Sequence, residues 1–250
     1  MIELNNISKT YGQTQALQSV TLTFRAGETT VLIGPSGCGK STLLRLIIGL
    51  AAPDSGTIMF SGTSVSLKTV FSLRRKMGYV IQEGGLFPHL TARQNITVMA
   101  CYLKWNADRT ENRLDELLEL TQFPHDGLDR FPVQLSGGQQ QRVSLMRALM
   151  LDPDVLLLDE PLGALDPMIR ADLQSELKEI FHALKKTVIL VTHDMGEAGF
   201  FGDEIVLFRE GKIIQTGTLE GLVLTPSDQF VTQFINAQRS PLESVRAKHL

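Results

Sequence analysis

The chain has 250 residues, of which 43% are hydrophobic and 20% are charged, and its formal net charge is −3 at pH 7. This length allows one large α/β domain with an inserted subdomain, and the composition is that of a soluble protein with a substantial core. The slight acidity argues against nucleic acid as the main partner, although a phosphate site needs only local positive potential.

The two cysteines, Cys38 and Cys101, lie far apart and lack a metal-ligand spacing, which favours a reducing compartment over a disulfide framework. The N-terminal residues contain no apolar stretch typical of a signal peptide, and no window reaches the roughly 18 apolar residues that span a bilayer. We therefore expect a cytosolic protein, or one that is held at a membrane through a partner.

Short strands separated by turn residues are predicted in the first third of the chain, at 2–4, 17–24, 29–33, 57–60 and 77–81. The third strand runs directly into a glycine-rich turn, and an apolar-periodic helix follows over 40–50. Pro53 forbids the continuation of that helix.

Helical patterns then dominate, at 91–103, 109–121 and 137–151, and strands return at 155–158, 188–192 and 204–208 with a helix at 167–184 between them. Fully apolar strands are typical of a parallel sheet that is buried on both faces. The chain is therefore predicted to be an α/β core, with a helical insertion at about 83–155 inside one domain over 1–236, followed by a short polar tail over 237–250.

Residues 34–41 match the pattern Gly-x-x-x-x-Gly-Lys-[Ser/Thr] at every position, between a predicted strand and a predicted helix. Glycines let several backbone N–H groups converge on phosphate oxygens, and the start of the helix adds favourable potential. Lys40 is predicted to reach the β- and γ-phosphates, Ser41 to ligate Mg²⁺ and Thr42 to contact the α-phosphate. A purely structural glycine turn is the weaker alternative. The residues predicted to bind nucleotide here are Gly34, Pro35, Ser36, Gly37, Cys38, Gly39, Lys40, Ser41 and Thr42.

The apolar strand 155–158 leads directly into two acidic residues, Asp159 and Glu160. Because a strand interior does not tolerate charge, carboxylates at its carboxyl end are typical of a site. Asp159 is predicted to hold the hydration shell of Mg²⁺, and Glu160 is predicted to be the general base that polarises an attacking water. This pattern is weak alone, but it becomes specific when a phosphate loop lies upstream.

The pentapeptide Leu-Ser-Gly-Gly-Gln at 135–139 makes the chain resemble the ATP-binding subunits of ABC transporters, over about residues 1–235. Ser136 is placed to cap a helix, and Gly137 and Gly138 expose N–H groups at its start. In that family this segment contacts the γ-phosphate held by the other subunit. The resemblance therefore implies that Ser136, Gly137, Gly138 and Gln139 bind ATP across a head-to-tail dimer. A simple helix cap is the alternative.

Further positions agree with this resemblance. It implies that Tyr11 stacks on adenine, that Gln82 senses Mg²⁺ and the γ-phosphate, and that Asp166, within 164–166, lies at the dimer seam. His193, after a predicted strand, is implied to contact the γ-phosphate. On their own, Tyr11 would be a surface tyrosine and His193 an incidental residue. The catalytic residues so implied are Lys40, Gln82, Glu160 and His193, and the metal ligands are Ser41, Gln82 and Asp159.

The lack of apolar spans implies separate membrane subunits, as in bacterial importers. Several stretches resemble osmoprotectant importer ATPases, which handle glycine betaine, choline and related quaternary amines: 74–75, 78–82, 85–89, 103–105, 135–142 and 161–167. The resemblance implies ATP and Mg²⁺ as cofactors and a peripheral place on the cytoplasmic face of the inner membrane. It implies three partners: a second copy, integral membrane permease subunits and, indirectly, a solute-binding protein. Glu83 departs from the family, which often has Gln there, and many members continue into a C-terminal regulatory domain.

The segment 83–89, with its apolar pair Leu86 and Phe87, is predicted either to receive a helix of the membrane subunit or to pack beneath its own subdomain. Three other classes stay open. Kinases and GTPases would share only the phosphate loop, and the chain has no Asn-Lys-x-Asp motif. Soluble ABC proteins of translation or DNA repair normally have two fused cassettes or a long coiled-coil insertion, and the sequence shows neither. The third is the soluble cassette of an exporter or lipid-transport complex.

Overall fold

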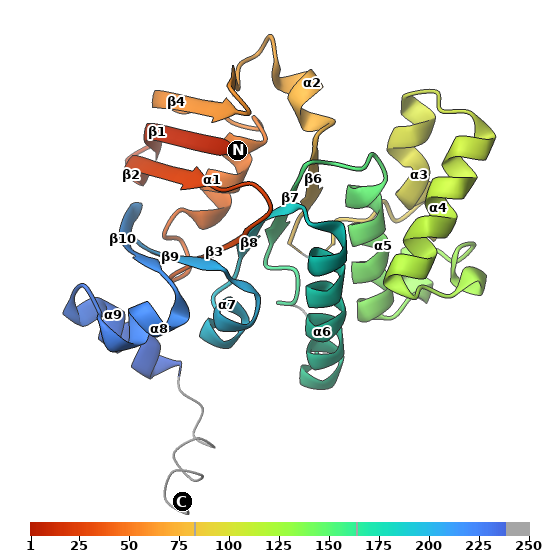
Figure 1. Ribbon diagram of the computed structural model, residues 1–250. Helices are drawn as coiled ribbons and strands as arrows, with labels where there is room; N and C mark the ends of the chain where they lie inside the picture. Colours follow the sequence, from red (N-terminus) through yellow and green to blue (C-terminus); the bar gives the residue numbers. More distant parts are fainter. Residues whose placement is uncertain (83, 164, 239–250) are drawn as a thin grey trace, which may run out of the picture.

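Two β-sheets and the helices that cover them form the computed structural model, which describes residues 1–82, 84–163 and 165–238 (Figure 1). The smaller sheet is antiparallel, in the order β2-β1-β4-β5. Its strands are β1 (Ile2–Tyr11), β2 (Thr14–Phe24), β4 (Ser55–Phe60) and β5 (Thr63–Ser64).

Strand β1 is longer than the predicted strand at 2–4. Asn6 has a positive φ of 52°, and the register of β1 against β2 shifts between Leu4 and Ile7. This irregularity moves the next buried side chain from an even to an odd position, so the period-two pattern ends at Leu4 although the strand does not.

The larger sheet has six strands in the order β10-β9-β3-β8-β7-β6, and only the β9–β10 pair is antiparallel. Its strands are β3 (Thr29–Ile33), β6 (Met77–Val80), β7 (Val155–Asp159), β8 (Thr187–Val191), β9 (Glu204–Arg209) and β10 (Lys212–Gly217). Every residue of β3, β7 and β8 is buried, as expected for parallel strands covered on both faces. Because parallel strands end at one edge, the segments that follow these three strands lie together.

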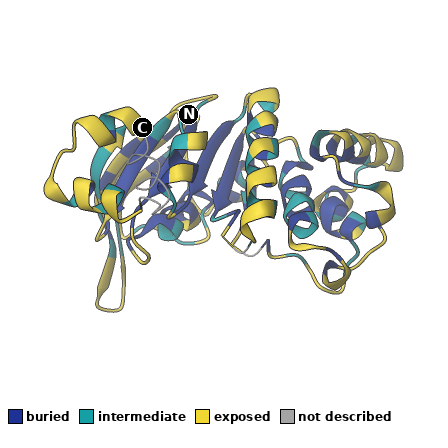
Figure 2. Cartoon of the chain, turned by 90° about the horizontal axis from the view of Figure 1, so that it is seen from below, coloured by how far each residue is buried: buried dark blue, intermediate teal, exposed yellow. Residues whose placement is uncertain are grey.

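The larger sheet separates two hydrophobic cores. In β3, Val31 and Ile33 face one core while Leu32 faces the other, and β7 divides its leucines in the same way. One core lies under the helices that follow β6, and the other joins the larger sheet to the smaller one. Figure 2 shows the buried strands of the sheet between helices whose outer faces are exposed.

Nine α-helices lie within the described residues. They are α1 (Lys40–Ile47), α2 (Val70–Arg74), α3 (Ala92–Tyr102), α4 (Ala107–Thr121), α5 (Gly137–Leu149), α6 (Pro167–Leu184), α7 (Met195–Phe201), α8 (Leu219–Leu224) and α9 (Gln229–Ala237). Two 3₁₀ turns, His125–Gly127 and Pro132–Gln134, connect α4 to α5. Within the described part of the chain, no helix has both the length and the apolar character that crossing a bilayer would require.

Helices α3, α4 and α5 all lie between β6 and β7, which are adjacent strands of the larger sheet. The chain therefore leaves the sheet after β6 and returns beside it, and the three helices project from that edge of the sheet (Figure 1). Of these helices, α5 contacts β6 as well as α3 and α4, so it joins the projecting helices to the sheet.

Helix α1 ends at Ile47, three residues before its predicted end. Gly49 has a φ of 71°, and a Cβ placed on it would lie 2.4 Å from a methyl carbon of Val70. A glycine in the left-handed region ends the helix before Pro53 can do so. The predicted tail falls almost entirely on 239–250, which lie outside the described residues.

Candidate functional site

The loop between β3 and α1 has a backbone path that glycine alone can follow at two positions. Gly34 has a φ of 149° and Gly39 a φ of 109°. A Cβ on Gly34 would lie 2.2 Å from the carbonyl oxygen of Phe208, and one on Gly39 would lie 2.4 Å from that of Ala16. The loop is thus pressed against neighbouring backbone and delivers its N–H groups to the start of α1, where an anion is favoured.

Lys40 is folded over this loop. Its Nζ donates hydrogen bonds to the carbonyl oxygens of Gly34 (2.7 Å) and Pro35 (3.1 Å), and the residue is 5% exposed. The buried ammonium brings positive charge to a cavity of about 300 Å³ at the end of β3. The residues that line this cavity, the phosphate-loop cavity, are Ser36, Gly37, Gly39, Lys40, Ser41, Thr42, Gln82 and Glu160.

Cys38 fills space behind the loop. It is buried, and this burial raises the pKa of its thiol above the ordinary value, although the charge of Lys40 acts in the opposite direction. A neutral, buried thiol is a poor nucleophile. The structure therefore assigns Cys38 a packing role within the loop.

Ser41 and Asp159, which the sequence predicts to hold one cation, meet across the site. The hydroxyl of Ser41 donates to Oδ1 of Asp159 at 2.8 Å, and Asp159 is 4% exposed. Burial raises the pKa of the Asp159 carboxyl; the hydrogen bond from Ser41 lowers it and the charge of Glu160 raises it further. A hydroxyl and a carboxylate oxygen beside a phosphate loop fit Mg²⁺, which takes few protein ligands and completes its shell with phosphate and water.

Tyr79 also belongs to this cluster, although the sequence did not identify it. Its hydroxyl donates to Oδ2 of Asp159 at 3.4 Å. Burial and the charge of Asp159 raise the pKa of Tyr79 to about 12, so it stays a donor. Tyr79 lies on β6, in register with Leu157 of β7. Only the pairing of these strands reveals that it reaches Asp159.

Glu160 and His193 extend from the ends of two neighbouring strands, β7 and β8. Glu160 has a φ of 47°, and its N–H donates to the carbonyl oxygen of Val191 at 3.0 Å. Oε2 of Glu160 lies 3.4 Å from Nδ1 of His193. Gln82, which follows β6, completes the group, because Gln82 and Glu160 line the phosphate-loop cavity together.

A second cavity of about 370 Å³ adjoins this group and shares Gln82 and Glu160 with it. Its remaining walls come from Gly84, which follows β6, from the start of α5 and from the segment between β7 and α6. The residues that line it are Gln82, Gly84, Gly137, Gln140, Gln141, Glu160, Pro161, Gly163 and Leu165.

Ser136 caps α5, which confirms its prediction as an N-cap. Its hydroxyl accepts the N–H of Gln139 at 3.3 Å, and the Gln139 side chain accepts the N–H of Ser136 at 3.0 Å. A Cβ on Gly137 would lie 3.1 Å from Leu165, and one on Gly138 would lie 3.0 Å from Ile169. These glycines let α5 start close to α6. Among the described residues that line the phosphate-loop cavity, none comes from 135–139.

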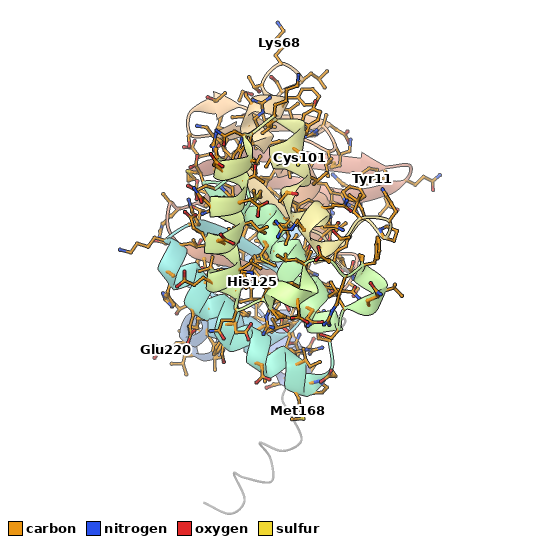
Figure 3. All side chains as sticks on the ribbon, turned by 90° about the vertical axis from the view of Figure 1, so that its right-hand side faces the viewer. Tyr11, Lys68, Cys101, His125, Met168 and Glu220 are labelled. Atoms are coloured by element: carbon orange, nitrogen blue, oxygen red, sulfur yellow. The ribbon has the colours of Figure 1, made fainter. Side chains whose placement is uncertain are left out.

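Tyr11 and Asp166 lie apart from the two cavities. Tyr11 ends β1, is 48% exposed, and has the ammonium of Lys9 5.4 Å from its ring centre; Figure 3 shows it at the side of the molecule. The carboxylate of Asp166 caps α6 by accepting the N–H groups of Met168 (3.2 Å) and Ile169 (3.1 Å). Ala164 lies outside the described residues.

Beneath His193 lies a buried carboxylate that sequence reasoning missed. Glu197 is 5% exposed, and its Oε2 accepts the hydroxyl of Thr192 at 2.6 Å. Asp194 donates its N–H to the same hydroxyl (3.1 Å) and accepts the N–H of Glu197 (3.1 Å). The sequence did contain a signal at this point: Asp194 is followed three positions later by Glu197, and this spacing is typical of a helix start, here that of α7.

A glycine-rich loop before a helix, a buried carboxylate at the end of another parallel strand of the same sheet and a second glycine-rich helix start define a phosphate-loop nucleotide-binding protein. The chain belongs to the ABC transporter family, whose model matches residues 17–163. The predicted fold class is therefore confirmed: an α/β phosphate-loop core with a β-rich N-terminal part and helices inserted between β6 and β7.

Two relatives and one solved structure show how similar the chain is to known proteins. It is 45% identical to the choline transport ATP-binding protein OpuBA of Bacillus subtilis over 96% of this chain and 63% of that protein. It is 46% identical to a probable sulfate/thiosulfate import ATP-binding protein, CysA, of Chlorella vulgaris over 94% of this chain and 98% of that one. The dimeric cassette MJ0796 bound to ADP and Pi superposes with a TM-score of 0.78 at 34% identity, covering 88% of this chain and 99% of that one. The chain thus spans less than two thirds of the length of OpuBA.

Proposed function

We propose that this chain is the ATP-hydrolysing subunit of an ABC importer and that it acts as a head-to-tail dimer. The observation that carries the proposal is the hydrogen bond of 2.8 Å between Ser41 and Asp159, beside a loop that buries Lys40. A buried carboxylate is costly to charge unless a cation or donors face it. The carboxylate of Asp159 lies opposite the start of α1, and this arrangement suits a binding site for a magnesium nucleotide.

The residues of the chain divide the chemistry among them. The loop N–H groups and Lys40 bind and orient the phosphates, and Ser41, Asp159 and Gln82 would hold Mg²⁺. When bound there, Mg²⁺ would neutralise charge on the phosphate oxygens. Glu160 would accept the proton of an attacking water, and its position on the wall of the phosphate-loop cavity supports this role. His193 faces Glu160 at 3.4 Å and helps to orient the transferred group.

The dimer supplies the second half of each site. The start of α5 faces the second cavity, and no described residue of 135–139 lines the phosphate-loop cavity of its own chain. A second copy that placed Ser136, Gly137 and Gly138 over the nucleotide would close the site with further N–H groups. In this dimer, Tyr11 would lie beside the adenine and Gln139 at the start of α5. Asp166 would lie at the dimer seam.

Further partners follow from the importer proposal. Integral membrane permease subunits would hold the protein at the cytoplasmic face of the inner membrane, and a solute-binding protein would deliver the solute. The domain would extend over 1–236, with 83–155 as its inserted helical part and 237–250 as its tail. Within the surface 83–89, Glu83 lies outside the described residues, and Phe87 is exposed.

We propose osmoprotectants of the quaternary amine type as the solute. The resemblance of 85–89 and 161–167 to such importer ATPases supports this, as does the similarity to a choline transport protein. A sulfate/thiosulfate import protein is equally similar, so identity alone does not choose the solute. Uptake of labelled choline and glycine betaine by proteoliposomes that contain this chain with its permease is the test. Uptake of sulfate instead would contradict osmoprotectants as the solute. Efflux instead of uptake would contradict the proposal that the transporter is an importer.

The hydrolytic activity itself is tested on the purified chain. We expect Mg²⁺-dependent release of phosphate from ATP, abolished by EDTA and reduced about 100-fold or more by Lys40→Ala, which removes a charge aimed at the phosphates. Lys212→Ala, which removes an exposed lysine of β10, is the matched control and should keep the rate of the wild type. Equal rates in the two variants would contradict the proposal.

A further inference from the structure

Three apolar side chains project from one corner of the molecule, where α1 ends and α2 begins. Leu67 is 93% exposed, Phe71 71% and Leu50 58%. Together with the exposed cations Lys68 and Arg75 they form a surface that we name the α2 tip. Figure 1 places it at the upper end of the molecule, and Figure 3 shows Lys68 at the end opposite Met168.

The α2 tip is held in shape by its own hydrogen bonds. The hydroxyl of Thr69 donates to the carbonyl oxygen of Ser64 at 2.5 Å and accepts the N–H of Ser66 at 3.0 Å. The N–H of Val70 donates to the carbonyl oxygen of Ser66 at 2.8 Å. These bonds bracket Leu67 and Lys68 on both sides, so the outward position of Leu67 is a built feature of the turn.

Arg74 joins the two parts of the tip. Its guanidinium donates to the carbonyl oxygens of Ile48 (2.9 Å) and Gly49 (2.8 Å) and lies 5.6 Å from the ring centre of Phe71. Leu50 follows Gly49 directly. The end of α1 and the exposed face of α2 are therefore tied together, and their apolar side chains form one surface.

The charge of this region is opposite to that of the chain. Residues 55–82 contain four basic residues and no acidic residue, although the whole chain has a net charge of −3. Lys76 lies 4.0 Å from Asp154, and Arg74 is engaged at the end of α1. Within the described part of the chain, this leaves Lys68 and Arg75 as the cations of the tip that can meet an external anion.

We propose that the α2 tip binds directly to the surface of an anionic lipid bilayer, with Leu67 and Phe71 entering the headgroup region and Lys68 and Arg75 meeting lipid phosphates. Exposed apolar side chains ringed by cations, without acidic residues among them, are the chemistry of interfacial binding. The tip is a convex projection, which a deformable lipid surface can surround, whereas a protein partner would need a hollow made to fit. This goes beyond the proposed function, because it requires neither nucleotide nor permease.

The test is co-sedimentation of the full purified chain, without nucleotide, with vesicles of phosphatidylcholine alone or mixed with phosphatidylglycerol. We expect binding to the mixed vesicles that weakens as salt is raised. Lys68→Gln with Arg75→Gln should reduce the partition coefficient by about fivefold for each charge removed. Leu67→Ser with Phe71→Ser should reduce it about tenfold or more.

Matched control variants carry the same changes on other surfaces. Lys185→Gln with Lys212→Gln removes two exposed cations elsewhere, and Met168→Ser with Val133→Ser removes two exposed apolar side chains that are 82% and 89% exposed. Both controls should bind vesicles like the wild type. Equal binding to the two kinds of vesicle, or equal losses in tip and control variants, would overturn the proposal. So would tip variants that bind vesicles normally but lose assembly with detergent-solubilised permease, because the occupant would then be a protein. ATP hydrolysis measured without vesicles reports on the proposed function separately.

Discussion

His193 and Glu160 face each other, with Nδ1 of the imidazole 3.4 Å from Oε2 of the carboxylate. They come from the ends of β8 and β7, which pair in parallel with Asp159 opposite Val191. The backbone N–H of Glu160 also donates to Val191. The meeting of the two side chains is therefore a consequence of strand pairing, and both should act on the same phosphoryl group.

Glu160→Gln should lower the rate of ATP hydrolysis by about 10²–10⁴-fold, because the amide keeps the size of the side chain but cannot accept a proton. Nucleotide affinity should be retained, since the loop and Lys40 are unchanged. Phosphate release and binding of a fluorescent ATP analogue measure the two quantities. Glu220→Gln, on the exposed first turn of α8, is the control. A near wild-type rate for Glu160→Gln would remove Glu160 from the role of general base.

Ser136→Arg should prevent dimerisation driven by ATP while leaving nucleotide binding to the monomer intact. The arginine would occupy the space through which the start of α5 meets the nucleotide of the partner. Size-exclusion chromatography with ATP, in a Glu160→Gln background, is the measurement. Because Ser136 also caps α5, its loss should cost about 1 kcal/mol of stability, which thermal unfolding would reveal. Ser175→Arg, on the exposed face of α6, should still dimerise. A stable dimer of the Ser136 variant would contradict the shared site.

Phe87→Ala should impair assembly with the permease but leave nucleotide binding and stability nearly unchanged. The ring is 44% exposed, and Asn95 holds the backbone of Phe87 by hydrogen bonds to its N–H (2.8 Å) and carbonyl oxygen (3.1 Å). Co-purification with the permease and solute uptake are the measurements. Leu86→Ala is the contrasting variant, because Leu86 packs against the core beneath the helices and should cost about 1–2 kcal/mol of stability. Full co-purification and normal uptake by Phe87→Ala would exclude this surface as the permease contact.

Glu197→Gln should raise the stability of the fold at about pH 8 and leave it unchanged at about pH 4. Burial raises the pKa of Glu197 in the folded state, with Asp194 acting in the same direction and Arg170 and His193 against it. The protonated form is therefore favoured by folding, and its contribution to stability is lost as pH rises through the folded pKa. Glutamine is neutral throughout and can still accept the hydroxyl of Thr192. Melting temperatures at the two pH values test this. A Glu197→Gln variant that is less stable than the wild type at high pH would contradict a raised pKa of Glu197 in the folded state.

Much of the core could be predicted because its signals are local. The strand at 29–33 and the helix at 167–184 have their predicted bounds, since the first is apolar throughout and the second starts at a capping Asp166 followed by proline. The sequence predicted that Ser41 and Asp159 belong to one site, and their hydrogen bond agrees with this prediction. Ser41 follows β3 and Asp159 ends β7, and both strands end at the same edge of the larger sheet, so residues more than a hundred positions apart meet there.

What escaped prediction depends on tertiary contacts. Tyr79 reaches Asp159 only because β6 pairs with β7. Helix α8 has six residues and buries only Leu222, so it carries little periodic signal. Helix α9 did carry one, since Phe230, Val231, Phe234 and Ile235 recur at helical spacing and pack against the core. The capping residues Thr218 and Asp228 were a further signal for the two helices. The antiparallel strand β10 went unpredicted because its residues are half-buried or exposed and do not alternate.

Beside the phosphate loop, three segments that are far apart in the sequence contact one another through backbone atoms, at Ala16, Gly39 and Gly211. A Cβ placed on Gly39 would lie 2.4 Å from the carbonyl oxygen of Ala16, and a Cβ placed on Gly211 would lie 2.9 Å from the same oxygen. The N–H of Gly211 donates to Cys38, and its carbonyl oxygen accepts the N–H of Gln18. The smaller sheet is thus a wall of the phosphate loop, so the molecule cannot be cut into a catalytic fragment and a dispensable N-terminal one. A fragment that began after β2 would keep every phosphate-loop residue in sequence and lose the surface that shapes them.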